Sequence, residues 1–189
     1  MEKQGTILRP ILIVALITGL ILLVPLVAMQ FTDQVVWTAL DFTVMGLLLF
    51  SIGCSFVVAT RSAPNTLFKI AMAFGLGATL FMIWVNLAVG IIGSGPHFGN
   101  WMYVLVVVVG LVGTIRSRLQ AKGMEQTMYA MALTLFFIAG VALMMGMDQY
   151  SGSSLMEILG VTVFLSSPFA IAGVLFRYAG EEKSGAVVQ

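Results

Sequence analysis

Six long runs of apolar residues constrain the fold of this chain, at 11–29, 35–60, 70–93, 98–115, 127–147 and 155–176. Each run has between 18 and 26 residues, and about 20 apolar residues in a helix cross the hydrocarbon core of a bilayer. Lipid offers no partner for backbone amides, so spans of this kind must be helical. The runs leave only short loops and tails. We therefore expect an all-α transmembrane bundle of six helices, forming a single integral membrane domain over 1–189.

The charged residues exclude several other classes of protein. Only 9% of the residues are charged, against roughly 25% in a soluble domain, which excludes a soluble globular fold. A net charge of +1 gives no argument for a nucleic-acid partner, and we expect none. With one cysteine, Cys54, and one histidine, His97, the chain cannot form an internal disulfide or a Cys/His zinc site. We expect no metal and no cofactor.

The basic residues lie in alternate loops and thereby predict an orientation. The loops at 30–34, 94–97 and 148–154 carry no Lys or Arg, whereas the other loops and both tails carry all nine. The nine are Lys3, Arg9, Arg61, Lys69, Arg116, Arg118, Lys122, Arg177 and Lys183. Short loops rich in Lys and Arg stay in the cytoplasm. We therefore expect both termini in the cytoplasm and three in-out-in hairpins.

The first apolar run has a second interpretation. Lys3 and Arg9 precede it and the small residue Ala28 lies near its end, as in a cleaved signal peptide. Its 19 residues exceed the usual apolar region of such peptides, about 7 to 15 residues. A membrane span is the prediction, and cleavage is its alternative.

The first and third predicted hairpins look alike. Each has an Asp-Gln pair in its outer loop, a carboxylate early in the descending helix (Asp41, Glu157) and an Arg 20 residues further on (Arg61, Arg177). A parallel internal repeat would produce this pattern, as in some transporters. The general gathering of acids outside and bases inside would produce it too.

Small residues at four-residue spacing predict close packing of helices, because lipid supplies no hydrophobic drive between them. They occur at Ala15 and Gly19, at Ala71 with Gly75 and Thr79, and at Ala142 and Gly146. Met124, Met128 and Met131 share one face of the fifth span, where methionine is an adaptable filler of apolar cores. Pro25 and Pro168 predict kinks or local unwinding.

A segment at 84–94 reads Trp-Val-Asn-Leu-Ala-Val-Gly-Ile-Ile-Gly-Ser, and Asn100, Met102 and Tyr103 follow it. It resembles an uncharacterised family of small bacterial polytopic membrane proteins, in which this run closes a membrane span. In that family the next loop usually begins with acidic residues and Asn-Pro, whereas here it reads Gly-Pro-His-Phe-Gly. The resemblance extends more weakly over 37–116. It implies the bacterial inner (cytoplasmic) membrane and implies no activity.

Three polar residues inside the predicted spans are candidates for ligand binding: Asp41, Asn86 and Glu157. Ionisable groups within a span are costly and therefore mark function by default. At 1.5 Å per residue, Asp41 and Asn86 should lie about 9 and 10 Å below the outer boundary, and Glu157 about 3 Å. An acidic outer half without Lys or Arg would attract cations or protons. Alternatively, Asp41 hydrogen-bonds Asn86 and locks two helices, and Glu157 reaches the interface.

Two functions follow from these residues, and catalysis is not one of them. The chain has no GxSxG, HExxH or phosphate-binding Gly-Lys loop, so we do not expect an enzyme. The first function is a non-catalytic accessory or scaffold subunit, which packs in the lipid bilayer against a membrane-protein partner, whereas a homo-oligomer would support the second function. The second is a small cation- or proton-coupled solute-binding or transport protein with an outward-facing acidic pocket.

Overall fold

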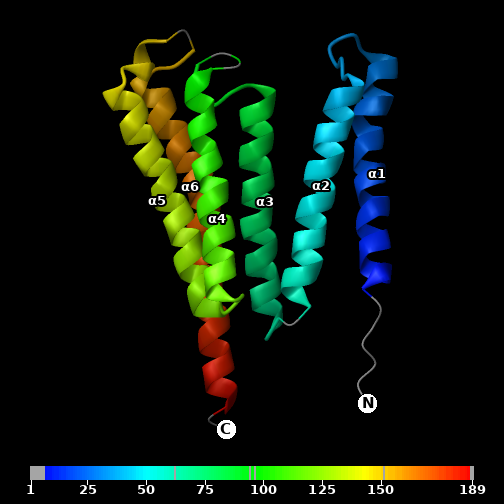
Figure 1. The fold of residues 1–189 in the computed structure, drawn as a ribbon, viewed down its shortest axis with the longest axis vertical. Coiled ribbons are helices and arrows are strands. Elements are labelled where there is room, and N and C mark those ends of the chain that lie inside the picture. Colours follow the sequence, from blue (N-terminus) through cyan, green and yellow to red (C-terminus); the bar gives the residue numbers. More distant parts are fainter. Residues whose placement is uncertain (1–6, 62, 94, 96, 151, 188–189) are drawn as a thin grey trace. The chain divides into compact units, whose positions relative to one another are not determined.

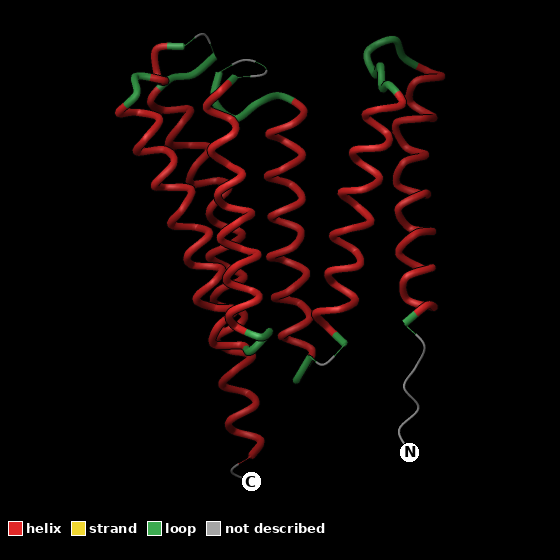
Figure 2. The backbone as a smooth tube through the Cα atoms, in the orientation of Figure 1, coloured by secondary structure: helices red, strands yellow, loops and turns green. Residues whose placement is uncertain are grey.

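The computed structural model describes residues 7–61, 63–93, 95, 97–150 and 152–187, and the side chains of these residues up to 182. The predicted positions Lys3, Ser94 and Pro96, and the side chain of Lys183, lie outside the described residues. The described residues form helices and loops without a strand, as predicted (Figures 1 and 2). The helices are α1 (Leu8–Phe31), α2 (Ala39–Thr60), α3 (Thr66–Ala88), α4 (Val104–Ser117), α5 (Ala121–Met144) and α6 (Leu155–Val187). Two short 3-10 helices, η1 (Phe98–Tyr103) and η2 (Met147–Gln149), precede α4 and α6.

Six segments of the described chain are helical, long enough and apolar enough to cross a membrane, and η1 together with α4 makes one of them. The prediction of six spans is therefore confirmed, and the chain is a multi-pass membrane protein by the length and composition of its helices. The observed ends of the helices differ from the predicted ends of the spans where polar residues or glycines occur. The fifth helix begins at Ala121, before the predicted 127, because polar residues such as Lys122 and Glu125 form its first turns. The third ends at Ala88, and Gly90 and Gly93 follow with φ of +75° and +71°.

Neither proline ends its helix. Pro25 lies inside α1 and Pro168 inside α6, and both helices continue through them, so neither helix unwinds there and a kink stays a prediction. Near Pro168, the hydroxyls of Ser166 and Ser167 donate to the carbonyl of Val163 at 3.1 and 2.6 Å.

The chain divides into two compact units, 1–61 and 62–189, which we describe separately. In the first unit α1 and α2 form an antiparallel hairpin (Figure 1). Two glycines of α2 let the helices approach, since a Cβ at Gly53 would lie 2.5 Å from Cγ1 of Val14 and one at Gly46 would lie 3.3 Å from Cδ1 of Leu22. The buried residues of the two helices are Thr18 of α1 and Ala59 of α2.

The second unit packs α3, α4, α5 and α6 around a core of its own. α5 packs against both α4 and α6, and α6 also packs against α3. Phe68 of α3 and Phe176 of α6 meet edge to face with ring centroids 5.0 Å apart. The predicted methionine face is buried in this core, with Met124, Met128 and Met131 each at most 5% exposed.

The glycines of the second unit explain how its helices approach. A Cβ at Gly75 would lie 2.8 Å from Sδ of Met128, and one at Gly173 would lie 2.7 Å from Cε1 of Tyr129. Ala71 is fully buried one turn before Gly75, so the predicted close packing of this stripe is confirmed. Gly19 of α1 differs, because a Cβ there would meet nothing within 4 Å.

In each unit the described basic residues lie at one end of the helices. In the first unit Arg9 is in the first turn of α1 and Arg61 caps the end of α2. In the second unit they lie near the start of α3, around the α4–α5 turn and in the last part of α6. These residues are Lys69, Arg116, Arg118, Lys122 and Arg177. The arrangement agrees with hairpins whose basic ends share one side of a membrane, and the cytoplasmic assignment of that side stays a prediction.

Candidate functional site

Asp41 lies in the first turn of α2, where it forms a capping box with Thr38. One carboxylate oxygen accepts from the Thr38 backbone N–H and from the Thr38 hydroxyl, each at 2.7 Å. In return the backbone N–H of Asp41 donates to the Thr38 hydroxyl at 3.3 Å. A capping box satisfies amides that the start of a helix leaves unpaired. Asp41 is exposed and two residues from the start of the helix, rather than buried two turns deep.

Glu157 holds the corresponding position at the start of α6. Its carboxylate accepts from the Ser154 backbone N–H at 2.8 Å, and its own backbone N–H donates to the Ser154 hydroxyl at 3.2 Å. The side chain is exposed. The two candidate acids therefore perform the same structural task. A signal for it was present in the sequence, since Thr38 and Ser154 each stand three residues before the acid.

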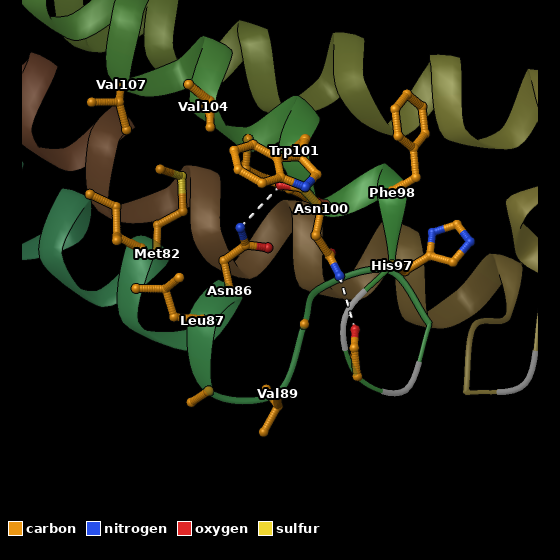
Figure 3. Close-up of a pocket in the computed structure, with 15 residues that line it drawn as sticks. Met82, Asn86, Leu87, Val89, His97, Phe98, Asn100, Trp101, Val104 and Val107 are labelled. Atoms are coloured by element: carbon orange, nitrogen blue, oxygen red, sulfur yellow. Dashed lines mark hydrogen bonds between the residues drawn. The ribbon is translucent and has the colours of Figure 1, made fainter. Parts of the chain in front are cut away.

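Asn86 lies near the end of α3, and its amide nitrogen donates to the backbone carbonyl of Asn100 at 3.0 Å (Figure 3). This bond joins α3 to η1. Asp41 belongs to the other unit, so the predicted pairing of Asp41 with Asn86 stays a prediction. Within the second unit, the partner of Asn86 is Asn100, which sequence reasoning noted only as part of the family resemblance.

Asn100 organises the loop between α3 and η1. Its side-chain oxygen accepts from the backbone N–H groups of Ile91 and Ile92 at 2.9 and 2.8 Å. Its side-chain nitrogen donates to the carbonyls of Ile92 and Gly95, both at 3.2 Å. The residue is 7% exposed, so all of its polar atoms are used inside the protein. The helical backbone hydrogen bonds end with α3, and the side chain of Asn100 supplies hydrogen-bond partners to the loop backbone in their place.

The same loop also contacts the loop between α5 and α6. The backbone N–H of Gly93 donates to the Ser153 hydroxyl at 2.8 Å, and the rings of His97 and Tyr150 stack with centroids 4.6 Å apart. His97 caps η1, because its Nδ1 accepts from the backbone N–H of Gly99 at 3.1 Å. His97 therefore has a structural partner on each side, Gly99 in η1 and Tyr150 in the loop between α5 and α6.

A cavity of about 540 Å³ opens beside Asn86, and we call it the outer cavity (Figure 3). It lies in the second unit, and its lining is mostly apolar or aromatic. The lining residues are Met82, Ile83, Asn86, Leu87, Ala88, Val89, Gly90, Gly95, His97, Phe98, Asn100, Trp101, Tyr103, Val104 and Val107. Its size suits a small molecule or part of a lipid, since ligand pockets span roughly 300 to 1,000 Å³. Asp41 and Glu157 are not among these residues.

The side-chain oxygen of Asn86 has no hydrogen-bond donor, although it is buried. The amide cannot be turned over to remove this defect, because the nitrogen is needed for the bond to Asn100. A buried acceptor without a donor is uncommon in folded proteins. Among the described residues, Oδ1 of Asn86 is therefore the one fully buried side-chain oxygen or nitrogen without a hydrogen-bond partner, and its residue lines this cavity.

Among the described residues, no group of three or more His, Cys, Asp or Glu side chains is arranged to hold a metal ion. The polar side chains that line the outer cavity are Asn86, His97, Asn100, Trp101 and Tyr103. No protein-family model, no curated protein and no solved structure matches the chain, so the assignment of function rests on the residues described above.

Proposed function

We propose that the protein is a non-catalytic accessory or scaffold subunit of a bacterial inner membrane, which works by packing against a membrane-protein partner. The observation that carries this proposal is the use of both candidate acids, Asp41 and Glu157, in capping boxes. A carboxylate that completes a helix start has a sufficient structural reason to be present. Proton or cation coupling would depend on Asp41 and Glu157, which already have this structural role. The accessory function does not require either residue.

The exposed face of α1 supports a partner in the membrane. Ala15 and Gly19 are both exposed, and a Cβ at Gly19 would meet no atom within 4 Å. Small residues on a lipid-facing helix let the backbone of a second helix approach closely. We therefore place the partner contact on this face of α1.

Purification of the full chain in mild detergent tests the proposal. A membrane protein that co-purifies at fixed stoichiometry is the expected result. Gly19→Leu should release this partner, whereas Gly140→Leu should keep it, because Gly140 of α5 is equally open to solvent or lipid. A chain that purifies only as a homodimer, with no second protein at any stoichiometry, contradicts the accessory function.

A second candidate, solute binding or transport, has one observation in its favour. The outer cavity places an acceptor without a donor, Oδ1 of Asn86, at the wall of an apolar space. A solute with an N–H or O–H group would supply the missing donor once the Asn86 side chain turned toward the cavity. Coupling to a cation or proton would still need Asp41 or Glu157. The two candidates differ in whether Asp41→Asn changes the dependence of Tm on cations and on pH.

A further inference from the structure

A second cavity, of about 650 Å³, lies between the C-terminal half of α4 and the N-terminal half of α5. We call it the basic groove. It lies at the end of the second unit where the basic residues gather. The groove shares no residue with the outer cavity, although Val107 of that cavity and Val108 of the groove are neighbours on α4.

Two cations stand at the rim of the basic groove. Arg116 lies in the last turn of α4 and Lys122 in the first turn of α5, and both side chains are exposed. Within the part of the chain that the structure describes, the single ion pair joins Arg177 and Glu181. No described carboxylate therefore forms an ion pair with Arg116 or Lys122. The amides of Gln120 and Gln126, which also line the groove, can donate to the same anion.

The wall of the groove is apolar above this rim. Val108 and Val112 line it along α4, and they are 45% and 59% exposed. Eight residues of helix separate Val108 from Arg116, which corresponds to about 12 Å along the axis. Charged side chains at one level and exposed valines further along the same groove match a molecule with an anionic head and an apolar tail.

The floor of the groove has no unpaired hydroxyl. A Cβ at Gly113 would lie 2.4 Å from Cγ2 of Thr127, so the two helices touch here. The Thr127 hydroxyl donates to the Gly123 carbonyl at 2.8 Å, and the Ser117 hydroxyl donates to the Thr114 carbonyl at 2.9 Å. An apolar chain in the groove therefore covers polar groups that are already satisfied, and it breaks no hydrogen bond.

We propose that the basic groove binds an anionic phospholipid, with the phosphate against Arg116 and Lys122 and an acyl chain along Val108 and Val112. Basic pockets between transmembrane helices bind the headgroups of anionic lipids in this way. A soluble phosphate would use the rim and leave the valine wall uncovered, so the wall favours the lipid. The proposal concerns the second unit alone and does not depend on the function proposed above.

Thermal unfolding of the detergent-solubilised full chain, titrated with short-chain phosphatidylglycerol, tests this proposal. Phosphatidylglycerol should raise the Tm of the native protein, whereas phosphatidylcholine of the same chain length should not. Arg116→Gln with Lys122→Gln should weaken the apparent affinity about 30-fold, since two basic residues near an anionic headgroup are lost. The matched control is Arg9→Gln with Lys69→Gln, which removes two charges from exposed residues outside the groove and should keep the native affinity.

Two further measurements keep the test decisive. Arg116→Lys with Lys122→Arg keeps both charges and should keep most of the lipid affinity, which separates loss of charge from loss of fold. Inorganic phosphate and glycerol 3-phosphate should leave the Tm unchanged at concentrations where the lipid acts. An equal stabilisation by inorganic phosphate would show a soluble-anion site and overturn the lipid proposal. Equal lipid affinity in the two Gln double variants would overturn it as well, because the groove would then add nothing to general charge attraction.

Discussion

The α1–α2 hairpin and the four-helix unit α3–α6 are both built from apolar helices, yet they bury their residues to very different degrees. α1 has the highest hydropathy of the six helices, but it buries only Thr18, whereas α5 buries nine of its residues. Since lipid is as apolar as a leucine side chain, hydrophobicity marks a helix that can cross a membrane. It does not mark a helix that forms a protein core.

Burial in the second unit follows small residues and the side chains that fill the space above them. Met128 lies over Gly75, and Tyr129 lies over Gly173. The same pairing of a glycine with a larger residue joins α1 to α2 at Gly53 and Val14. The hairpin has only a few such contacts, whereas the four-helix unit repeats them on several helix pairs. We therefore expect changes in the second unit to cost more stability than similar changes in the first.

Asn100→Ala should give the largest loss of stability. The side chain is buried and makes four hydrogen bonds to the backbone of 91–95. Its removal leaves buried amides and carbonyls without partners, at a cost of about 2–4 kcal/mol. Thermal unfolding in detergent measures the effect. A Tm within one degree of the native value would mean that the loop is held by contacts other than Asn100, and the loop would no longer distinguish the second unit from the first.

Gly173→Leu should give the next largest loss. A Cβ at Gly173 would already lie 2.7 Å from the ring of Tyr129, so a larger side chain must separate α6 from α5. Overpacking of this kind costs about 1–3 kcal/mol. The matched change in the first unit is Gly19→Leu, which should be neutral or slightly stabilising because the site is open and leucine favours a helix over glycine. Similar melting of both variants would contradict the contrast between the two units.

The sequence predicts features that depend on neighbouring residues better than contacts between residues far apart along the chain. The six spans follow from local composition, and the structure agrees with them at all six. The helix ends were less predictable, because polar first turns such as the one at Lys122 continue a helix beyond its apolar run. The packing at Gly75 was predicted from spacing alone, whereas the partner in space, Met128, comes from 53 residues away along the chain.

The candidate site shows the same limit. Asp41 and Glu157 were chosen because acids are rare in spans, and the Thr or Ser three residues earlier was the local signal that explains them. Asn86 is half-buried and stays a candidate for ligand binding, and its bond to Asn100 depends on how the loop folds back over the end of α3. A pattern of residue types does not encode that path.

The two capping boxes should each contribute a smaller amount. Thr38→Ala and Ser154→Ala remove the hydroxyls that accept from Asp41 and Glu157, and each change should cost about 1 kcal/mol. The Tm shift should be similar for the two variants, because the geometry of the boxes is similar. A much larger effect at one of them would indicate that its acid has a further role.

Asp41→Asn separates the two proposed functions. The variant keeps an acceptor for the Thr38 backbone N–H, so it should fold with nearly native stability. As an accessory subunit, the native protein and the variant should show the same dependence of Tm on cations and on pH between about 5 and 8. A cation-dependent stabilisation or a pH step that the variant lacks would instead support coupled transport and return Asp41 to the list of functional residues.

Asn86→Leu should have a small effect, although Asn86 lies beside the residue with the largest. The change removes one hydrogen bond to the Asn100 carbonyl, and single intramembrane hydrogen bonds contribute about 0.6 kcal/mol on average. It also removes the buried oxygen that has no donor, which offsets part of this loss. Asn86→Asp, measured at a pH high enough to ionise the carboxyl group, is the informative counterpart. The ionised carboxylate cannot donate to the Asn100 carbonyl and brings a second unpaired oxygen into the same place, whereas the protonated acid could donate there. We expect Asn86→Asp to melt well below Asn86→Leu. The reverse order would mean that a donor reaches the oxygen of residue 86, as a bound solute in the outer cavity would provide, and it would favour binding over a purely structural role.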